Sequence, residues 1–362
     1  MNSAAGERER LIVLLAAIEN PARAAAFSPD DPALVAVARR HRLTPLLSIS
    51  CGATLPPALA AAFRRDRVVT GARNMILARA AEECIRGFAA AGIPTIVLKG
   101  LDYETRLYHD PAARPTADVD LLVPGEHRRS AFGVLDRLGF EPRAAAPGFD
   151  DPDYHEVAWT RGGVEVDLHL ALAPLARCRI DYAALWRQAE AQQIGATETR
   201  VLCRQHAAVF QALHMAIDHF DVPAIYLIDL ARLLPTRDEA IQARGLARAW
   251  HCERPMATAL ALVASFLPGA PAAAATGAPS FAGSRITSTY GSVAALPRAE
   301  QLVRKLLHFD TPLELAAYVA VQSRRNLREV LERRVRRRSP RDRLGLTGEG
   351  SAPPVGVPRD PG

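Results

Sequence analysis

Lysine is nearly absent from this sequence of 362 residues. Only Lys99 and Lys305 occur among its 45 basic residues, and the other 43 are arginines. The two side chains are not interchangeable, because an ammonium is a compact point charge and a guanidinium is a planar fork. A lysine at position 99, where an apolar stretch ends, therefore favours a specific use over the alternative that it stands there by chance.

Paired cysteines and long apolar runs are lacking as well. The five cysteines are scattered and form no C-x-x-C pair, which argues against both a disulfide framework and a zinc ribbon. The apolar run at residues 11–18 is far shorter than the ~20 residues of a membrane-spanning helix. Its flank, Glu7-Arg8-Glu9-Arg10, lacks the net positive charge of a secretory signal. We therefore expect a cytoplasmic protein without a membrane partner.

The composition is that of an ordinary soluble globular protein, 49% hydrophobic and 23% charged. The length allows two or three domains and a sizeable core. The formal net charge of +6 is a mild excess that does not by itself indicate nucleic acid. Ten arginines fall between positions 324 and 343, so much of the positive charge is local.

The spacing of apolar residues predicts an α+β fold, in which helical N- and C-terminal regions flank a small mixed β-sheet. We expect helices over residues 1–91 and the α+β core over residues 92–200. A helical region at 201–338 follows, and its Ala/Gly/Pro/Ser-rich loop at 268–297 is expected to be flexible. The polar tail at 339–362 is expected to be disordered.

Three N-terminal stretches have helical periodicity: Glu9–Glu19, Asp31–His41 and Pro57–Ala91. Either Asp30 or Asp31 is a plausible helix start before Pro32, and Gly92 reads as a helix end. After the core, the helical pattern returns from Asp181 to about Leu267, with interruptions near Gly195 and Pro223. A helix is also expected over Pro312–Arg337.

The core reads as short strands separated by turn residues. The predicted strands are Ile93–Leu98, Val119–Val123, Phe140–Arg143, Tyr154–Thr160 and Val164–Leu170. Arg161-Gly162-Gly163 has the composition of a hairpin turn between the last two. Short helices are expected at Leu101–His109 and Glu126–Leu138.

Acidic residues occur on two of these strands. Because side chains alternate along a strand, Asp118 and Asp120 share one face, and Asp167 and His169 share a face of the later strand. Converging carboxylates are unfavourable unless a cation lies between them, and hard oxygen ligands suit Mg²⁺, with Mn²⁺ as the alternative. Two ions roughly 3.5–4 Å apart would clamp the attacking and leaving oxygens of a phosphoryl transfer. The third carboxylate would be a metal ligand or a base.

A possible phosphate site precedes this acidic pair. Gly100 lets the backbone approach a phosphate, and the start of the following helix favours anions. Lys99 would contact the triphosphate directly, and Arg114 in the next loop would clamp it. Each motif alone is weak, since an Asp-x-Asp pair is common on surface strands. Their order and spacing together favour the metal and phosphate interpretation.

The sequence also resembles the uncharacterised nucleotidyltransferase family of the polymerase-β-like superfamily over roughly residues 70–235. The resemblance is carried by four segments: Leu98-Lys99-Gly100, Tyr108-x-Asp110-Pro111-x-x-Arg114-Pro115-x-x-Asp118-Val119-Asp120-Leu121-Leu122-Val123, Leu138-Gly139-Phe140 and Val166-Asp167-Leu168-His169.

This resemblance implies an enzyme that uses an NTP and a divalent metal to transfer a nucleoside monophosphate, most simply AMP. By position, Asp118, Asp120 and Asp167 become the metal-binding carboxylates. Lys99 and Gly100 take the place of the superfamily's Gly-Ser phosphate loop. This sequence lacks that Ser. The acceptor, a small molecule, peptide or protein, is not identified by any residue.

Three further residues are candidates for substrate contacts. His169 would orient a metal ligand or touch the nucleotide, or it is a structural histidine. His214 and the Asp229-Leu230-Ala231 segment match residues that similar proteins often have. They would contact the acceptor or the base, although packing of polar groups between helices is the stronger alternative.

The Arg-rich stretch Arg324–Arg338 allows two interpretations. It would bind RNA, an acidic protein or phospholipid, but Glu329 and Glu332 are interleaved, which favours a solvated, salt-bridged helix. Nucleic acid is therefore not the favoured partner. A non-catalytic accessory or antitoxin protein and an RNA-modifying enzyme are the alternatives to a Mg²⁺-dependent nucleotidyltransferase.

Overall fold

The computed structural model describes residues 4–143, 155–174, 178–275, 286–287, 290, 304 and 309–335. These form the predicted α+β fold, with helices on both faces of one mixed sheet. The predicted disordered tail, 339–362, lies outside the described residues.

The N-terminal region is helical, as predicted. Its elements are α1 (Ala4–Glu19), the 3-10 helix η1 (Pro21–Ala26), α2 (Pro32–Arg40), α3 (Thr44–Cys51) and α4 (Pro57–Ala90). The individual elements η1 and α3 were not expected. The side chain of Asp31 caps α2 by accepting from the backbone N–H groups of Ala33 and Leu34, and Pro32 fills the first turn. Gly92, at φ +69°, follows the end of α4.

Seven strands form the sheet, in the order β3-β4-β5-β2-β1-β7-β6. Their bounds are β1 (Ile96–Val97), β2 (Val119–Leu122), β3 (Glu141–Pro142), β4 (Glu156–Arg161), β5 (Val164–His169), β6 (Glu190–Ile194) and β7 (Thr197–Val201). Strand β2 is antiparallel to β1 and parallel to β5, while β4 and β5 form the predicted hairpin through Gly162 and Gly163, both at positive φ.

The helical pattern expected from Asp181 onward is wrong for residues 190–201. After the short helix α7 (Tyr182–Gln188), these residues form the β6–β7 hairpin, which joins the sheet because β7 pairs in parallel with β1. Gly195 turns the hairpin at φ +58°. Thr197, Thr199 and Val201 are β-branched, which suits a strand better than a helix.

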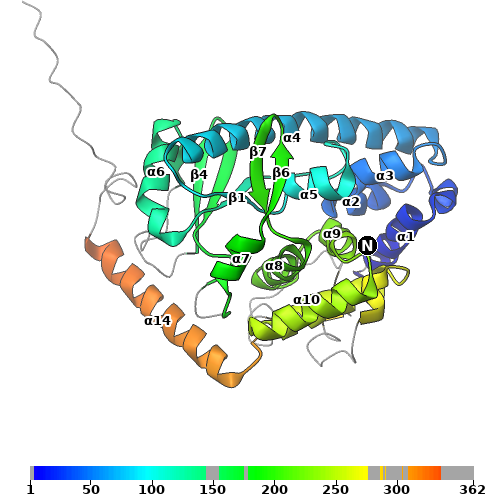
Figure 1. The fold of residues 1–362 in the computed structure, drawn as a ribbon. Helices are drawn as coiled ribbons and strands as arrows, with labels where there is room; N and C mark the ends of the chain where they lie inside the picture. The colour runs from blue at the N-terminus through cyan, green and yellow to red at the C-terminus, as the bar shows by residue number, and fades with distance from the viewer. Residues whose placement is uncertain are drawn as a thin grey trace, which may run out of the picture.

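Two apolar cores lie on opposite faces of the sheet. Val119, Leu121 and Val166 face α4 and the helix α6 (Arg128–Arg137), which follows the 3-10 helix η3 (Gly125–His127). Leu122 belongs to the core of the other face, which includes the helices α8 (Arg204–Ile217) and α9 (Ile225–Leu233). Figure 1 shows α4 above the sheet and α8 and α9 below it.

The C-terminal region continues with α10 (Arg237–Ala249), α11 (Glu253–Phe266), the 3-10 helix η4 (Pro271–Ala275) and α14 (Pro312–Val335). The predicted flexible loop, 268–297, thus begins with η4, in which Ala272 and Ala275 are buried. Residues 276–285 and 291–297 lie outside the described residues. Among the helices that are described, none is long and apolar enough to cross a membrane.

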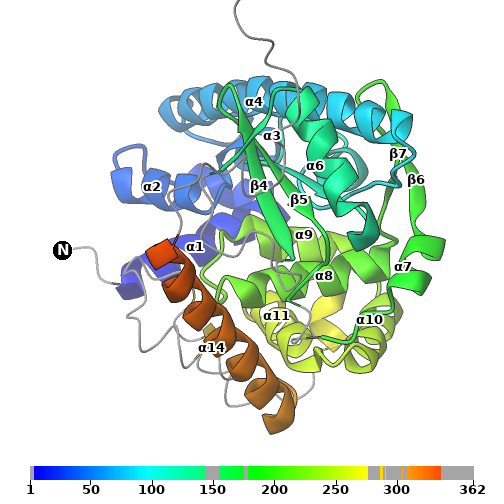
Figure 2. The ribbon, with the colours of Figure 1, turned by 90° about the vertical axis from the view of Figure 1, so that its left-hand side faces the viewer.

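Helix α14 runs along the outside of the molecule (Figure 2). It is held near its start, where Glu314 lies 2.7 Å from Nδ1 of His251. Asp310, just before the helix, accepts hydrogen bonds from the backbone of Glu253 and Arg254. Side chains beyond Arg324 are not among those described, so the RNA-binding and salt-bridged interpretations of this stretch both remain predictions.

The loop that leads into β2 is fastened to α4 by one buried side chain. Asn74 donates from Nδ2 to the carbonyls of Pro111 and Arg114, both at 2.8 Å, and its Oδ1 accepts from the backbone of Thr116 at 3.2 Å. Asn74 is fully buried. A helix from the N-terminal region therefore positions the residues that precede Asp118.

Replacing this side chain should destabilise the protein. Asn74→Ala leaves buried backbone groups of the loop without partners, so we expect a loss of about 1–3 kcal/mol in the free energy of unfolding. Urea unfolding followed by circular dichroism measures it. Asn20→Ala is the matched control, because Asn20 is exposed and makes no capping hydrogen bond. Equal stability of the two variants would contradict the positioning role.

Candidate active site

Three carboxylates meet on one face of the sheet. The parallel register of β2 and β5 places Asp120 opposite Asp167, and Asp118 comes just before β2. One oxygen atom of each of these residues lies within 4.8 Å of the others. Asp120 is buried, whereas Asp118 and Asp167 are partly exposed, so the group is accessible from one side. The predicted convergence of these residues is therefore present.

The carboxylates oppose one another's ionisation. Burial, followed by the charges of Asp120 and Asp118, raises the pKa of Asp167 to about 7. Burial and Asp120 also raise the pKa of Asp118. Burial acts in the same direction on Asp120, but Lys99 and His169 outweigh it and lower its pKa. A cation among the three would relieve this repulsion, and their hard oxygen donors fit Mg²⁺.

Lys99 acts on these carboxylates from within the protein. Its Nζ lies 2.8 Å from Oδ2 of Asp120 and 3.9 Å from Oδ1 of Asp118, and the side chain is 6% exposed. Burial alone would lower the pKa of Lys99, but Asp120 and Asp118 raise it. The ammonium thus stays charged and holds Asp120. This structure places it on the carboxylates, whereas the sequence suggested a direct contact with a triphosphate.

Gly100 occupies a position where any side chain would be strained. Its φ is +53°, and a Cβ there would lie 2.9 Å from Cγ2 of Thr116 and 3.9 Å from Oδ2 of Asp120. The chain then enters the helical turn α5 (Leu101–Tyr103), which widens into the π-helix η2 (Glu104–Tyr108). The absence of a side chain lets the backbone pass close to the carboxylates.

His169 holds Asp120 from the other side. Its Nε2 lies 3.1 Å from Oδ1 of Asp120, and its Nδ1 lies 3.6 Å from Oε2 of Glu156 on β4. Burial lowers the pKa of His169, but the hydrogen bond with Asp120 and the charge of Glu156 raise it overall. The ring is buried edge-on against Phe210 of α8. This geometry places His169 against a proposed metal ligand.

Arg114 and Asp229 form a buried ion pair. Nε and one terminal nitrogen of Arg114 lie 2.7–3.0 Å from the Asp229 oxygens, and the Tyr108 hydroxyl donates to Oδ1 at 2.7 Å. The side chains of Arg114 and Asp229 are 3% and 0% exposed. Arg114, which the sequence suggested as a triphosphate clamp, is bound to Asp229. The pair joins the loop between η2 and β2, the approach loop (residues 109–118), to α9.

His214 lies on α8, on the side of the helix that faces the sheet. Its ring centroid is 5.6 Å from that of Tyr226, and its Nε2 is 3.7 Å from Oδ2 of Asp218. Burial, followed by the charge of Lys99, lowers the pKa of His214 well below its usual value. A neutral imidazole, which has one N–H donor and one acceptor nitrogen, therefore lies close to the site.

The sequence interpretation missed two charged residues around the site, Arg42 and Glu156. A third, Asp218, lies one helical turn after His214, where the helical spacing of the sequence places it. Arg42 is near enough to Asp118 for its charge to lower the pKa of that carboxyl. Burial raises the pKa of Asp218 to about 6. Glu156 could have been found from the sequence, because it lies opposite His169 in the predicted β4–β5 hairpin. Arg42 approaches through tertiary packing, which local spacing does not reveal.

Arg42 has an unusual backbone. It follows the C-cap of α2 at φ +58°, where glycine is the common residue. The preceding residue fixes it in place, because Nδ1 and the carbonyl of His41 accept from the backbone of Ala224 and Ile225. Its guanidinium makes no hydrogen bond or ion pair within the described part of the chain.

Comparison with solved structures finds distant likenesses. The antibiotic-resistance factor ANT(2'')-Ia is 13% identical at a TM-score of 0.37, and the match covers 49% of this chain and 93% of that one. An antigenic nucleotidyltransferase-like protein from Paracoccidioides brasiliensis is 16% identical at a TM-score of 0.34, covering 56% and 92%. No curated protein sequence matches this chain.

A family assignment comes from the sequence itself. Residues 28–268 match the family described as uncharacterised nucleotidyltransferase. The match covers more than half of the chain and includes the three carboxylates, Lys99 and the Arg114–Asp229 pair. The chain therefore belongs to the uncharacterised nucleotidyltransferase family, as the resemblance of its motifs implied.

Proposed function

We propose that this protein transfers a nucleoside monophosphate, most simply AMP, from an NTP to a hydroxyl or phosphate acceptor and releases pyrophosphate. The observation that supports this most strongly is the meeting of Asp118, Asp120 and Asp167 within 4.8 Å. Mg²⁺ held by these carboxylates would neutralise negative charge on the transferring phosphoryl group. Family membership supports the reaction class.

The side chains around this group have distinct proposed roles. Lys99 and His169 keep Asp120 ionised and fix its orientation from two sides. Asp167 is partly exposed, so it is accessible to a proton from the acceptor hydroxyl. The acceptor oxygen then forms a bond to the α-phosphorus, and the bond between that phosphorus and the bridging oxygen to the β-phosphorus breaks. Asp118 would complete the metal site.

The triphosphate needs a positive partner beyond these groups. Lys99 and Arg114 are bound to carboxylates, whereas Arg42 lies beside Asp118 and is not paired with any described residue. We assign the triphosphate contact to Arg42 and the backbone at Gly100. Arg114 and Asp229 act by holding the approach loop, and His214 is placed to contact the nucleotide or the acceptor.

Removing a metal-binding carboxylate should abolish transfer. Asp118→Asn and Asp120→Asn each keep the size of the side chain but remove a negative charge, so transfer should fall to background. The assay incubates the protein with labelled NTPs and a cell extract, and follows labelled products and pyrophosphate. Glu165→Gln is the control, since this carboxylate of β5 pairs with Arg143. Full activity in both variants, with unchanged circular dichroism, would refute the assignment.

The metal should stabilise the protein more strongly at higher pH. Because the pKa of Asp167 is about 7 in the folded chain, above its ordinary value, the metal-free protein loses stability as pH rises toward 7. Mg²⁺ prefers the ionised carboxylate, so the rise in Tm on adding Mg²⁺ should be larger at pH 8 than at pH 6. Thermal unfolding with and without Mg²⁺ measures it. An equal rise at both pH values would contradict this linkage.

Arg42 should determine the affinity for the triphosphate. Arg42→Gln removes charge-assisted hydrogen bonds to phosphate, which corresponds to a loss of about 10- to 100-fold in the affinity for MgATP. Isothermal titration measures binding of MgATP and of adenosine, and adenosine affinity should not change. Arg65→Gln is the control, because Arg65 lies exposed on α4. Unchanged MgATP affinity in Arg42→Gln would place the triphosphate elsewhere.

A further inference from the structure

A cavity lies at the opposite end of β2 from Asp118. Its volume is 820 Å³, and it is formed where β2 and β5 end and the chain approaches β1. None of the three carboxylates lines it, and neither does Lys99. Leu122 forms part of its wall and is 1% exposed. A volume of this size is typical of small-molecule sites.

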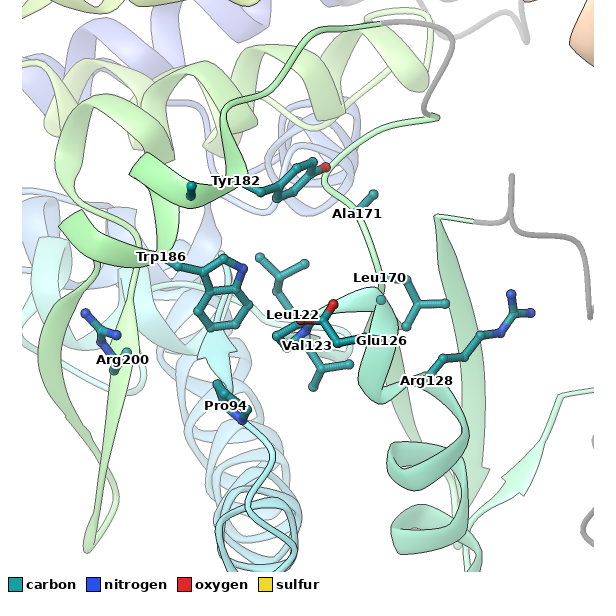
Figure 3. A pocket seen from close by; sticks show the side chains of 13 residues that line it. Pro94, Leu122, Val123, Glu126, Arg128, Leu170, Ala171, Tyr182, Trp186 and Arg200 are labelled. Carbon is teal, nitrogen blue, oxygen red and sulfur yellow. The ribbon is translucent and has the colours of Figure 1, made fainter.

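The walls of this cavity are apolar and aromatic. Leu122 and Leu170 contribute from the sheet side, and Tyr182 and Trp186 contribute from α7 (Figure 3). The Tyr182 hydroxyl accepts from the backbone of Leu172 at 2.9 Å, which fixes the ring. Aromatic faces such as these carry negative charge density and attract organic cations.

The charged residues at this cavity point in different directions. Figure 3 shows the side chain of Glu126 directed toward the cavity, between Trp186 and Leu170 in this view, whereas Arg128 and Arg200 extend away from its centre. Arg200 donates to the Ala189 carbonyl at 2.9 Å. Glu126 forms no hydrogen bond or ion pair with any residue that the structure describes. A carboxylate is therefore available at the cavity.

We propose that this cavity binds an organic cation, an ammonium group on an apolar body, as a second ligand of the protein. The apolar body would pack against Leu122, Leu170 and Tyr182, and the ammonium would lie between Trp186 and the Glu126 carboxylate. Both partners favour a cation: the indole through its ring, and the carboxylate through its charge.

Glu126 also has a simpler structural explanation. It lies in η3 just before α6, where an acidic side chain favours the positive end of the helix. That role needs no ligand and would leave amine binding unaffected by its removal. The two explanations therefore predict different amine affinities for a variant that lacks the Glu126 carboxylate.

Three probes with the same phenyl body and different charges test the proposal on the full chain. These are phenethylamine, phenethyl alcohol and 3-phenylpropanoate, titrated by calorimetry and by tryptophan fluorescence. We expect Kd for the amine to be about ten-fold lower than for the alcohol, and the anion to bind most weakly. Tighter binding of the anion would mean that Arg128 and Arg200 dominate. That result, or no binding of the amine up to about 10 mM, would overturn the proposal.

Variants connect the binding to these side chains. Glu126→Gln should raise Kd for the amine toward that of the alcohol, and Trp186→Leu should weaken both probes. Glu141→Gln is the matched control, because Glu141 is an exposed carboxylate on β3. Thermal unfolding checks that each variant is folded. Unchanged amine affinity in a folded Glu126→Gln variant would leave only the helix-end role and refute the proposal.

This site and the proposed nucleotidyl transfer can fail separately. Amine binding needs neither nucleotide nor metal, so Asp118→Asn should bind phenethylamine as the wild type does. MgATP should not compete with the amine, because the two sites share no lining residue. Competition would show that the cavity takes part of the nucleotide and would overturn the proposal of a second site.

Discussion

Repulsion among three carboxylates is the constraint on which this structure depends. The parallel register of β2 and β5 brings Asp120 and Asp167 together, and a shift by one residue would turn one of them to the opposite face. Lys99 and His169 compensate part of the negative charge by holding Asp120 from two sides. The negative charge that they do not compensate lies on Asp118 and Asp167, whose pKa values are raised. The unbalanced charge is thus located where it is accessible.

A buried ion pair next to the site stabilises this arrangement. The Arg114–Asp229 pair is buried and joins the approach loop of the core to α9 in the C-terminal region. Removing one partner of such a pair leaves an uncompensated buried charge, which typically destabilises a protein by about 3–5 kcal/mol. Asn74 ties the same loop to α4. The site is therefore built by all three regions of the chain, although its carboxylates come from the core alone.

The sequence was most informative where function and local pattern coincide. Period-two alternation placed Asp120 and Asp167 on strands with the correct faces and Asp118 on the same side, and the Gly162-Gly163 turn fixed one hairpin. The β6–β7 hairpin was missed because much of it is exposed and lacks a clear apolar alternation. The partner of Arg114 is 115 residues away, and no spacing rule identifies it. The same holds for Arg42, which reaches the site only through the packing of α2 and α9.

Helix α4 has a consequence for the motions open to this protein. It has 34 residues and so a length of about 51 Å. Leu59 and Phe63, in its first half, pack in the core shared with the N-terminal helices, and Leu77 and Phe88, in its second half, pack on the sheet. A hinge between these parts would have to break the helix or uncover one of its apolar faces. Substrate entry therefore does not use a hinge between the N-terminal helices and the sheet.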